Sequence, residues 1–275
     1  MIGRHCSGLG AVAFGLVFLS AAPALCEPGA LLTGFTAVNQ DAPQVSVVMV
    51  AGITRSDQLP PTLVQARKAL SANVALRDST LRDLADLMDG NAAFQYAKRL
   101  DFVAKPGLAA HAAHYYGIAA ATGRGGAIYG FIKALDALDP ATTTPGRLAN
   151  LRNILVTYAN AGSAPALEAV LRYHARNTPF TDMRAELDRI LVETDGPAAH
   201  AVALQLASEI LRSNTPTAAE LQKARQYLLR AEDSDSLRTR LISQNLLPLV
   251  EARVAALRPD QSFALQVDTQ GEITP

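Results

Sequence analysis

Apolar positions along this chain recur with the spacing of an amphipathic α-helix over most of its length. From about residue 60 onward, apolar side chains fall three and four residues apart, so that they share one face of a helix. The clearest stripes are Ile128, Phe131, Ile132 and Leu135; Leu148, Leu151, Leu155 and Tyr158; Leu167, Val170, Leu171 and His174; and Ala203, Leu206, Ala207 and Ile210. This spacing predicts a series of helices that each bury one face.

Clusters of Gly, Pro, Asn or Asp separate the stripes and mark the ends of the expected helices. Four glycines, Gly90, Gly123, Gly162 and Gly196, are separated by 33, 39 and 34 residues, and each lies between two helical stretches. A pair of helices of this length cannot bury its apolar faces alone, whereas stacked pairs share one continuous core. The pattern therefore predicts an all-α protein, an α-solenoid of stacked antiparallel helix pairs.

Residues 45–52 (VSVVMVAG) depart from this pattern, because a run rich in Val favours a strand. A run this short equally fits the start of a buried helix, and both interpretations stay open. We expect residues 25–55 to form a leader, poorly ordered or with a short strand, and residues 56–257 to form the helical repeat domain. The polar residues 258–275 lack periodicity and are expected to be a disordered tail.

The first residues have the features of an export signal. Arg4 supplies positive charge, residues 9–19 are apolar, and Ala22-Pro23-Ala24 fits a cleavage site of small residues. We therefore predict a signal peptide at 1–24 and a mature protein that is periplasmic or secreted. Cleavage after Cys26 is the alternative, lipid attachment to Cys26 stays open, and an uncleaved segment would instead anchor the protein in a membrane.

The composition agrees with a helical protein that does not bind nucleic acid. Lys plus Arg equals Asp plus Glu at 25 each, so the chain has no net basic charge to attract a polyanion. Ala and Leu, both strong helix formers, are abundant, and Trp is absent. The chain has two cysteines, and Cys6 leaves with the predicted signal peptide, so Cys26 has no partner for an internal disulfide.

Two stretches of the sequence resemble known helical repeats. Residues 116–125 (YGIAAATGRG) are similar to the core L-G-x-x-Y-x-x-G-x-G of Sel1-like repeats, with both later glycines in register. In the next unit Tyr158 lies four residues before Gly162, as in a plain tetratricopeptide repeat. Pro140 and Pro179 each follow a turn glycine by 17 residues and would end the second helix of a pair. The chain thus resembles the tetratricopeptide superfamily, including its Sel1-like branch, over roughly residues 78–213.

This resemblance implies a right-handed solenoid in which the first helix of each pair lines a concave groove. By that analogy the candidate protein-binding residues are Arg82, His111, Arg147, Asn150 and Arg184, although ordinary surface polarity explains each of them equally well. The resemblance also implies an exported scaffold or adaptor that binds another envelope protein in envelope or exopolysaccharide assembly or regulation. A glycan-binding or glycan-acting envelope protein, with a polysaccharide as partner, is one alternative. A membrane-anchored accessory subunit is the other, and it requires an uncleaved signal segment.

No catalytic or cofactor motif is complete in the sequence. His111 and His114 can share a helix face, but no further ligand lies at a metal-binding spacing. Residues 123–126 (GRGG) lack the preceding strand and the following Lys of a phosphate loop, so a turn between helices explains them better. His174 is expected to be a satisfied histidine at the edge of the core, and His200 to face solvent. We therefore expect no enzyme activity, no metal and no small-molecule cofactor.

Overall fold

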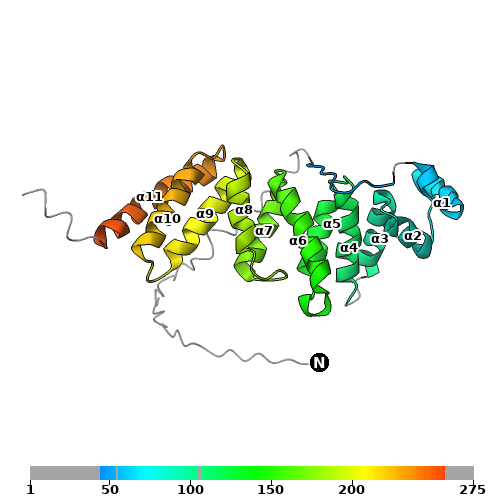
Figure 1. Ribbon diagram of the computed structural model, residues 1–275, viewed down its shortest axis with the longest axis horizontal. Coiled ribbons are helices and arrows are strands. Elements are labelled where there is room, and N and C mark those ends of the chain that lie inside the picture. Colours follow the sequence, from blue (N-terminus) through cyan, green and yellow to red (C-terminus); the bar gives the residue numbers. More distant parts are fainter. Residues whose placement is uncertain (1–43, 54, 104–106, 258–275) are drawn as a thin grey trace, which may run out of the picture. The chain divides into compact units, whose positions relative to one another are not determined.

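The computed structural model describes residues 44–53, 55–103 and 107–257, which lie within one compact unit, Val38–Pro275. These residues form eleven α-helices and no strand (Figure 1). The helices are α1 (Pro61–Ser71), α2 (Asp78–Asp86), α3 (Gly90–Val103), α4 (Ala109–Ala121), α5 (Ala127–Asp136), α6 (Pro145–Asn160), α7 (Ala164–Arg176), α8 (Arg184–Glu193), α9 (Pro197–Arg212), α10 (Ala218–Glu232) and α11 (Leu237–Ala256). The predicted signal peptide and the predicted tail lie outside the described residues.

Ten of these helices form five pairs, in each of which a turn of three to five residues joins two helices that pack against each other. The pairs are α2–α3, α4–α5, α6–α7, α8–α9 and α10–α11. We call α2, α4, α6, α8 and α10 the first helices, and α3, α5, α7, α9 and α11 the second helices. Helix α1 precedes the first pair and packs against α2.

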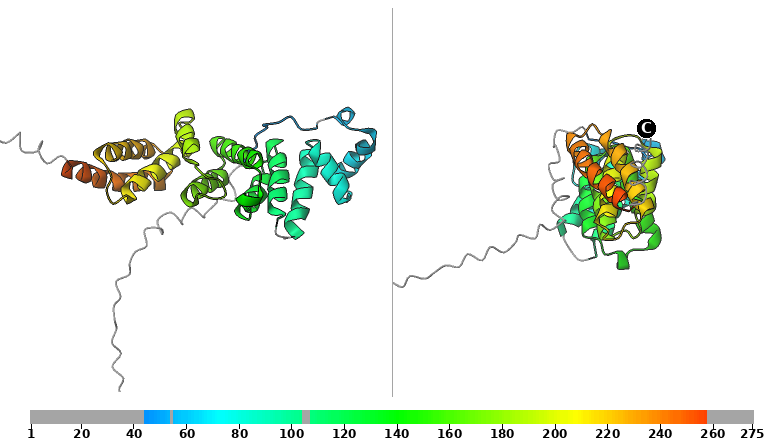
Figure 2. Two further views of the ribbon diagram at one scale, coloured as in Figure 1. Left: turned by 60° about the horizontal axis from the view of Figure 1, so that its bottom comes forward. Right: turned by 90° about the vertical axis from the view of Figure 1, so that its left-hand side faces the viewer.

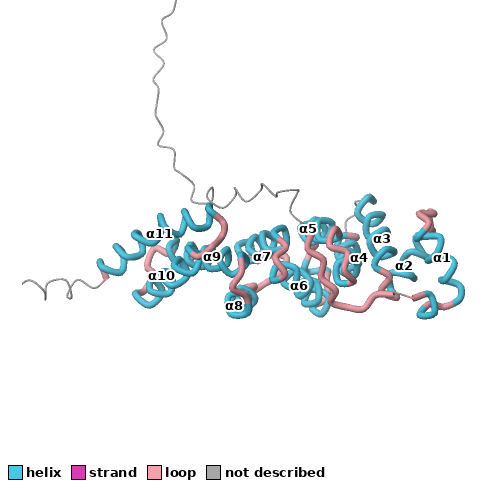
Figure 3. The backbone as a smooth tube through the Cα atoms, turned by 90° about the horizontal axis from the view of Figure 1, so that it is seen from above, coloured by secondary structure: helices cyan, strands magenta, loops and turns pink. Residues whose placement is uncertain are grey.

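The pairs stack in chain order, as the tube drawing in Figure 3 shows. Each second helix contacts the second helix of the next pair, from α3 to α5, α7, α9 and α11. Helix α4 also packs against the first helix α6, and α3 packs against α4. This is the adjacent-helix packing of a helical solenoid, and the all-α prediction is confirmed. The right-handed sense of the stack and the repeat family stay predictions.

Local sequence signals account for where several helices begin. Proline occupies the first turn of α1, α6, α7 and α9, where its missing N–H leaves no helical hydrogen bond unmade. Helix α10 begins with a capping box, in which Thr217 and Glu220 bond each other's backbone N–H. The hydroxyl of Ser236 accepts from the N–H of Thr239 at the start of α11.

The core is one continuous set of apolar side chains that runs through all the pairs. Its largest fully buried members include Tyr158, Tyr173 and Phe131. The hydroxyl of Tyr158 in α6 donates to the carbonyl of Ala120 in α4 at 2.8 Å, which ties the second pair to the third. Gly117 lets these helices approach, because a Cβ there would lie 3.1 Å from Cδ1 of Ile154.

The four evenly spaced glycines do not share one role. Gly123 and Gly162 adopt positive φ angles of 96° and 90° in their turns, as expected of glycine between two helices. Gly90 instead is the first residue of α3, and the positive φ falls on Met88. A Cβ on Gly90 would lie 2.2 Å from Oγ1 of Thr122, so this glycine serves close packing and the prediction of a turn glycine was wrong there.

Residues 44–53 form neither a helix nor a strand but an extended segment that lies on the turns of the first pairs. It makes a single antiparallel bridge, between Val48 and Thr122. The N–H of Met49 donates to the carbonyl of Ala121 at 2.8 Å. The N–H of Ile53 donates to the carbonyl of Met88 at 3.3 Å. The Val-rich sequence suits this extended form, and several of its backbone N–H groups donate to residues of two different helix pairs.

Candidate interaction surface

The five residues predicted to line a groove all lie on first helices. Arg82 is on α2, His111 on α4, Arg147 and Asn150 on α6, and Arg184 on α8. Arg82, His111 and Asn150 are exposed, and the two others are half-buried. The structure brings Arg82, His111 and Arg147 together around one group of side chains. Asn150 lies one turn further along α6 than Arg147. Arg184 makes a separate set of contacts.

That group is a cluster of titratable side chains from three consecutive first helices. We call it the Arg82–Arg147 cluster, and its members are Arg82, Asp86, His111, His114, Tyr115 and Arg147. It forms because Tyr115 in α4 is held against α2: the Tyr115 hydroxyl donates to Oδ1 of Asp86 at 2.9 Å. The ring of Tyr96 in α3 meets the Tyr115 ring edge-on, with centroids 4.8 Å apart.

Two members of the cluster, His114 and Tyr115, have pKa values that their surroundings shift. Burial lowers the pKa of His114, and the positive charge of Arg147 lowers it further. His111 acts in the same direction, whereas Asp86 opposes it. The pKa of Tyr115 is raised by burial and by its hydrogen bond to Asp86, while Arg82 opposes that rise. These mutual effects show that side chains from α2, α4 and α6 lie within electrostatic reach of one another.

The two arginines of the cluster are available to a ligand. Arg82 faces the carboxylate of its chain neighbour Asp83 at 3.9 Å, and both side chains are more than half exposed. Arg147 makes no ion pair with any carboxylate in the part of the chain that the structure describes. Asp86, the one acid of the cluster, accepts the hydroxyl of Tyr115. Within the cluster two arginines outnumber the one acid, and Asp83 beside Arg82 offsets one of the two positive charges.

Arg184, the fifth predicted residue, is already occupied within the protein. Its Nε lies 3.1 Å from both carboxylate oxygens of Asp188, one helical turn further along α8. Its Nη2 donates to the hydroxyl of Tyr227 in α10 at 3.4 Å, a long contact. The structure therefore assigns Arg184 to the packing of α8 and α10 and not to the Arg82–Arg147 cluster.

Several other charged side chains bind an opposite charge on the neighbouring helix pair, including Arg152 in α6, which lies 3.4 Å from Glu186 in α8. Lys133 in α5 binds Asp101 in α3 at 2.9 Å, and Arg172 in α7 binds Asp136 in α5 at 2.9 and 3.0 Å. Nε2 of His174 in α7 lies 3.1 Å from Glu209 in α9. His174 is thus the partnered histidine that the sequence indicates. Arg82 and Arg147 differ from these residues, because Arg82 faces only its chain neighbour Asp83 and Arg147 binds no acid of a neighbouring pair within the described ranges.

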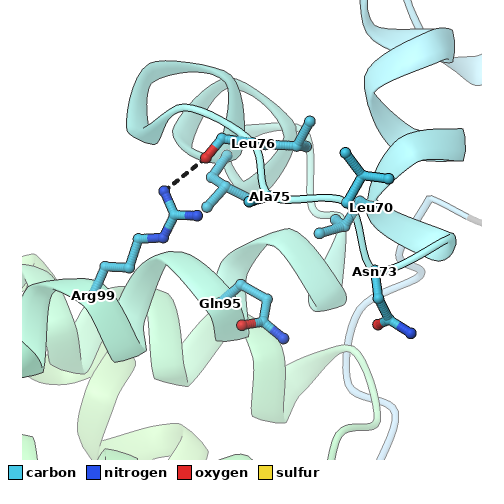
Figure 4. A pocket seen from close by; sticks show the side chains of 8 residues that line it. Leu70, Asn73, Ala75, Leu76, Gln95 and Arg99 are labelled. Carbon is cyan, nitrogen blue, oxygen red and sulfur yellow. Dashed lines mark hydrogen bonds between the residues drawn. The ribbon is translucent and has the colours of Figure 1, made fainter.

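A small pocket lies near α1, with a volume of about 230 Å³, between the loop after that helix and helix α3. Figure 4 shows Leu70, Asn73, Leu76 and Gln95 around it, with Arg99 reaching across. The guanidinium of Arg99 donates to the carbonyl of Leu76 at 2.8 Å and also binds Asp78. Because the one charged group at this pocket is engaged twice by the protein itself, the pocket is a weaker candidate than the Arg82–Arg147 cluster.

Several features bear on other chemistry. Among the described residues no group of three or more His, Cys, Asp or Glu side chains is placed to hold a metal ion, and His111 and His114 gain no such partner. No helix within these ranges is long and apolar enough to cross a membrane. His200 is half-buried, and its Nδ1 is shielded from water without a hydrogen-bond partner in the described part of the chain. The expectation that His200 faces solvent was wrong, because α9 packs among four other helices, α7, α8, α10 and α11.

The fold and the surface define an all-helical protein of stacked helix pairs with a basic cluster on its first helices. The chain matches no protein-family model, no curated protein and no solved structure. The structure itself therefore carries the functional argument.

Proposed function

We propose that this protein is an exported, periplasmic scaffold or adaptor that binds another protein of the cell envelope and acts by binding, without catalysis. The proposed contact surface is the face of the first helices around the Arg82–Arg147 cluster. The right-handed tetratricopeptide-like or Sel1-like architecture belongs to this proposal, since repeat proteins of that kind present their first helices to partners.

The observation that carries the proposal is the pair of arginines at the Arg82–Arg147 cluster, because no acid of a neighbouring helix pair binds either of them. The second helices pair Lys133, Arg172 and His174 with acids of the neighbouring pair. Arg82 and Arg147 lack such partners in the described residues. Exposed arginines are frequent contact residues in protein interfaces, because the guanidinium binds carboxylates through two hydrogen bonds. A partner segment that carries Asp or Glu would complement this surface.

Crosslinking in the native envelope fraction, followed by mass spectrometry of the captured chains, tests the proposal. The wild-type protein is expected to capture one defined envelope protein. The double variant Arg82→Gln/Arg147→Gln is expected to lose most of that capture, and the matched control Arg176→Gln, an exposed arginine on a second helix, is expected to retain it. Capture that is identical in all three proteins would show that the partner binds elsewhere.

A glycan as ligand is the outcome that would replace this proposal. If the purified protein bound or cleaved an envelope polysaccharide and captured no protein, the adaptor function would be wrong. Binding of that polysaccharide should then be measured in the double variant as well, because neutral glycans do not require the charge of Arg82 and Arg147.

A further inference from the structure

The extended segment 44–53 occupies a surface formed at the ends of first helices. Its backbone N–H groups donate to the carbonyl of Ala121, the last residue of α4, and to that of Met88, which follows α2. The N–H of Val47 lies 3.5 Å from the hydroxyl oxygen of Tyr158 in α6. The segment therefore crosses the first three pairs in the order opposite to that of the chain, and the left view of Figure 2 shows it running back to α1.

This surface offers hydrogen-bond acceptors that the helices themselves cannot use. The last carbonyls of a helix have no partner further along it. The carbonyl of Ala121 accepts the N–H of Met49 at 2.8 Å and that of Val50 at 3.1 Å. Any extended chain can donate N–H groups in this way, so these contacts recognise the main chain more than the sequence. We call this surface the turn track, and its residues are Met88, Ala121, Thr122, Gly123 and Gly125.

Two glycines of the turn track leave room for a second backbone. A Cβ on Gly125 would lie 2.2 Å from the carbonyl oxygen of Val45, and a Cβ on Gly123 would lie 2.9 Å from Cγ2 of Val48. By comparison, a Cβ on Gly162, the turn glycine of the third pair, meets no atom within 4 Å in the described part of the chain. Close approach of an extended chain therefore distinguishes the turn of the second pair from that of the third.

The side chains of the segment alternate between the turn track and solvent. Val45 and Val47 are half-buried and pack against the core, whereas Ser46 and Val48 are exposed. This period of two is typical of an extended chain with one face on a surface. The turn track therefore selects β-branched side chains at two positions two residues apart and leaves the residue between them in water.

The segment is held loosely for its length. None of residues 44–53 is buried, and Val48 and Val50 are 70% and 41% exposed. These apolar side chains gain little when the segment docks, because much of their surface stays in water. The segment also precedes α1 in the chain, so it can leave the turn track without the unwinding of any helix.

We propose that the turn track is a binding site for an extended segment of a partner protein, and that residues 44–53 fill this site while no partner is bound. The matching partner segment is uncharged and carries Val or Ile at two positions two residues apart. Polar side chains are accepted at its outward positions, because these face water. Arg82 and Arg147 take no part in this site, which is therefore independent of the surface proposed above.

A partner suits the turn track better than a second copy of this chain. A second copy brings only the segment that each chain already holds, so exchange between copies adds no contact. The tethered segment competes at an effective concentration on the order of millimolar. Exchange between copies at micromolar concentration is therefore unfavourable, whereas a partner segment with further contacts of its own can displace residues 44–53.

Fluorescence anisotropy of the full chain with a labelled peptide of residues 44–53 (QVSVVMVAGI) tests the proposal. The wild type should bind this peptide weakly, because its own segment competes. Met49→Pro removes the N–H that donates to Ala121 and should bind the peptide at least about tenfold more tightly. Val47→Asp, which places a charge at a half-buried position of the segment, should have the same effect.

Variants of the turn track locate the bound peptide. Gly125→Ala, added to Met49→Pro, should abolish peptide binding, because the new Cβ meets the backbone of any chain in this place. Gly196→Ala in the same background is the control and should retain binding, since its Cβ meets no described atom within 4 Å. Arg82→Gln/Arg147→Gln should also retain it, which separates this site from the Arg82–Arg147 cluster.

Variants of the peptide test which side chains the track selects. A peptide with Val45→Asp and Val47→Asp should not bind, because both side chains face the core. A peptide with Val48→Thr and Val50→Thr should bind as well as the original, because both positions are exposed.

Three results would overturn the proposal. The first is no peptide binding by the Met49→Pro and Val47→Asp chains when circular dichroism shows normal helix content. The second is peptide binding that survives Gly125→Ala. The third is a wild-type dimer in sedimentation velocity that Gly125→Ala abolishes, since it would assign the turn track to a second copy in place of a partner.

Discussion

The ring of Tyr116 in α4 lies directly against the backbone of Gly130 in α5. A Cβ atom on Gly130 would be 2.5 Å from Cε1 and Cζ of the Tyr116 ring, closer than non-bonded carbon atoms approach. Tyr116 is buried and cannot swing away. Glycine in the middle of a helix is otherwise unfavourable by about 1 kcal/mol, so close packing of the second pair explains its presence.

Gly130→Ala should therefore destabilise the protein although alanine is the better helix former. We expect a loss of about 1–3 kcal/mol, the usual cost of overpacking a core. Gly146→Ala is the control, because a Cβ there meets no atom within 4 Å in the first turn of α6. Its stability should be unchanged or higher by up to about 1 kcal/mol. Urea denaturation of both variants measures the difference, and equal stabilities would contradict the packing described for Tyr116.

Gly125→Ala should detach the extended segment 44–53 from the turns. A Cβ on Gly125 would lie 2.2 Å from the carbonyl oxygen of Val45, and because this oxygen is a backbone atom, the segment itself must shift to relieve the contact. Limited proteolysis should then cut near residues 45–50 faster than in the wild type, while circular dichroism reports the same helix content. Gly196→Ala, with no atom within 4 Å of the added Cβ, serves as the control. Unchanged proteolysis of the Gly125→Ala protein would show that the segment does not rest on this turn.

The lowered pKa of His114 predicts a loss of stability in mild acid. The folded protein favours the neutral imidazole, because burial and then Arg147 act against its positive charge. The contribution of neutral His114 to folding stability is fully present above the ordinary pKa of 6.5. This contribution is lost as the pH falls below that value through the lower pKa of His114 in the folded state. Denaturation between pH 7 and pH 5 should show this decline in the wild type and a weaker decline in His114→Gln. An identical decline in both proteins would assign the effect to other groups.

Removal of Arg147 should raise the pKa of His114. Arg147 lowers that pKa through its charge, so Arg147→Gln moves it back toward the ordinary value of 6.5. The imidazole resonances of His114, followed by NMR across a pH titration, report the shift directly. Arg176→Gln should leave the His114 titration as it is in the wild type. If both variants titrate like the wild type, α6 does not hold Arg147 beside α4.

Export predicts a shortened mature protein. The sequence predicts cleavage after Ala24, so the expected mature chain begins at Leu25, with cleavage after Cys26 as the alternative. Mass spectrometry of the protein recovered from its native envelope identifies the first residue. An intact amino-terminal segment that begins at Met1 would contradict cleavage and favour the membrane-anchored alternative.

The sequence predicted those parts of the fold that depend on local patterns. The apolar stripes around Phe131 and Leu155 mark helices whose stripe residues are buried or half-buried, because helical periodicity is visible in any short window. Pro140 and Pro179 follow the ends of α5 and α7 as expected. Gly90 was misassigned, because its role is a contact with Thr122, 32 residues away, and spacing alone cannot reveal such a contact.

The extended segment and the cluster depend on contacts that no local pattern reveals. The hydrogen bonds of Met49 with Ala121 and of Tyr115 with Asp86 join residues that are far apart in the sequence. The five candidate residues fall on expected first helices. A position on such a helix does not show that Arg184 has a partner within the protein. The spacing of Arg184 and Asp188, four residues apart on one helix, was the signal that could have revealed that pair.

Site-specific photocrosslinking tests the central claim, a protein partner on the first helices, most directly. A photoreactive amino acid at Asn150, exposed on α6 one turn from Arg147, should capture a single envelope protein in the native compartment. The same amino acid at Ala175, exposed on the second helix α7, should capture far less of it. Addition of Arg82→Gln/Arg147→Gln should remove the product at residue 150. Equal products from both positions, or a product at residue 150 that survives the loss of both arginines, would contradict the account.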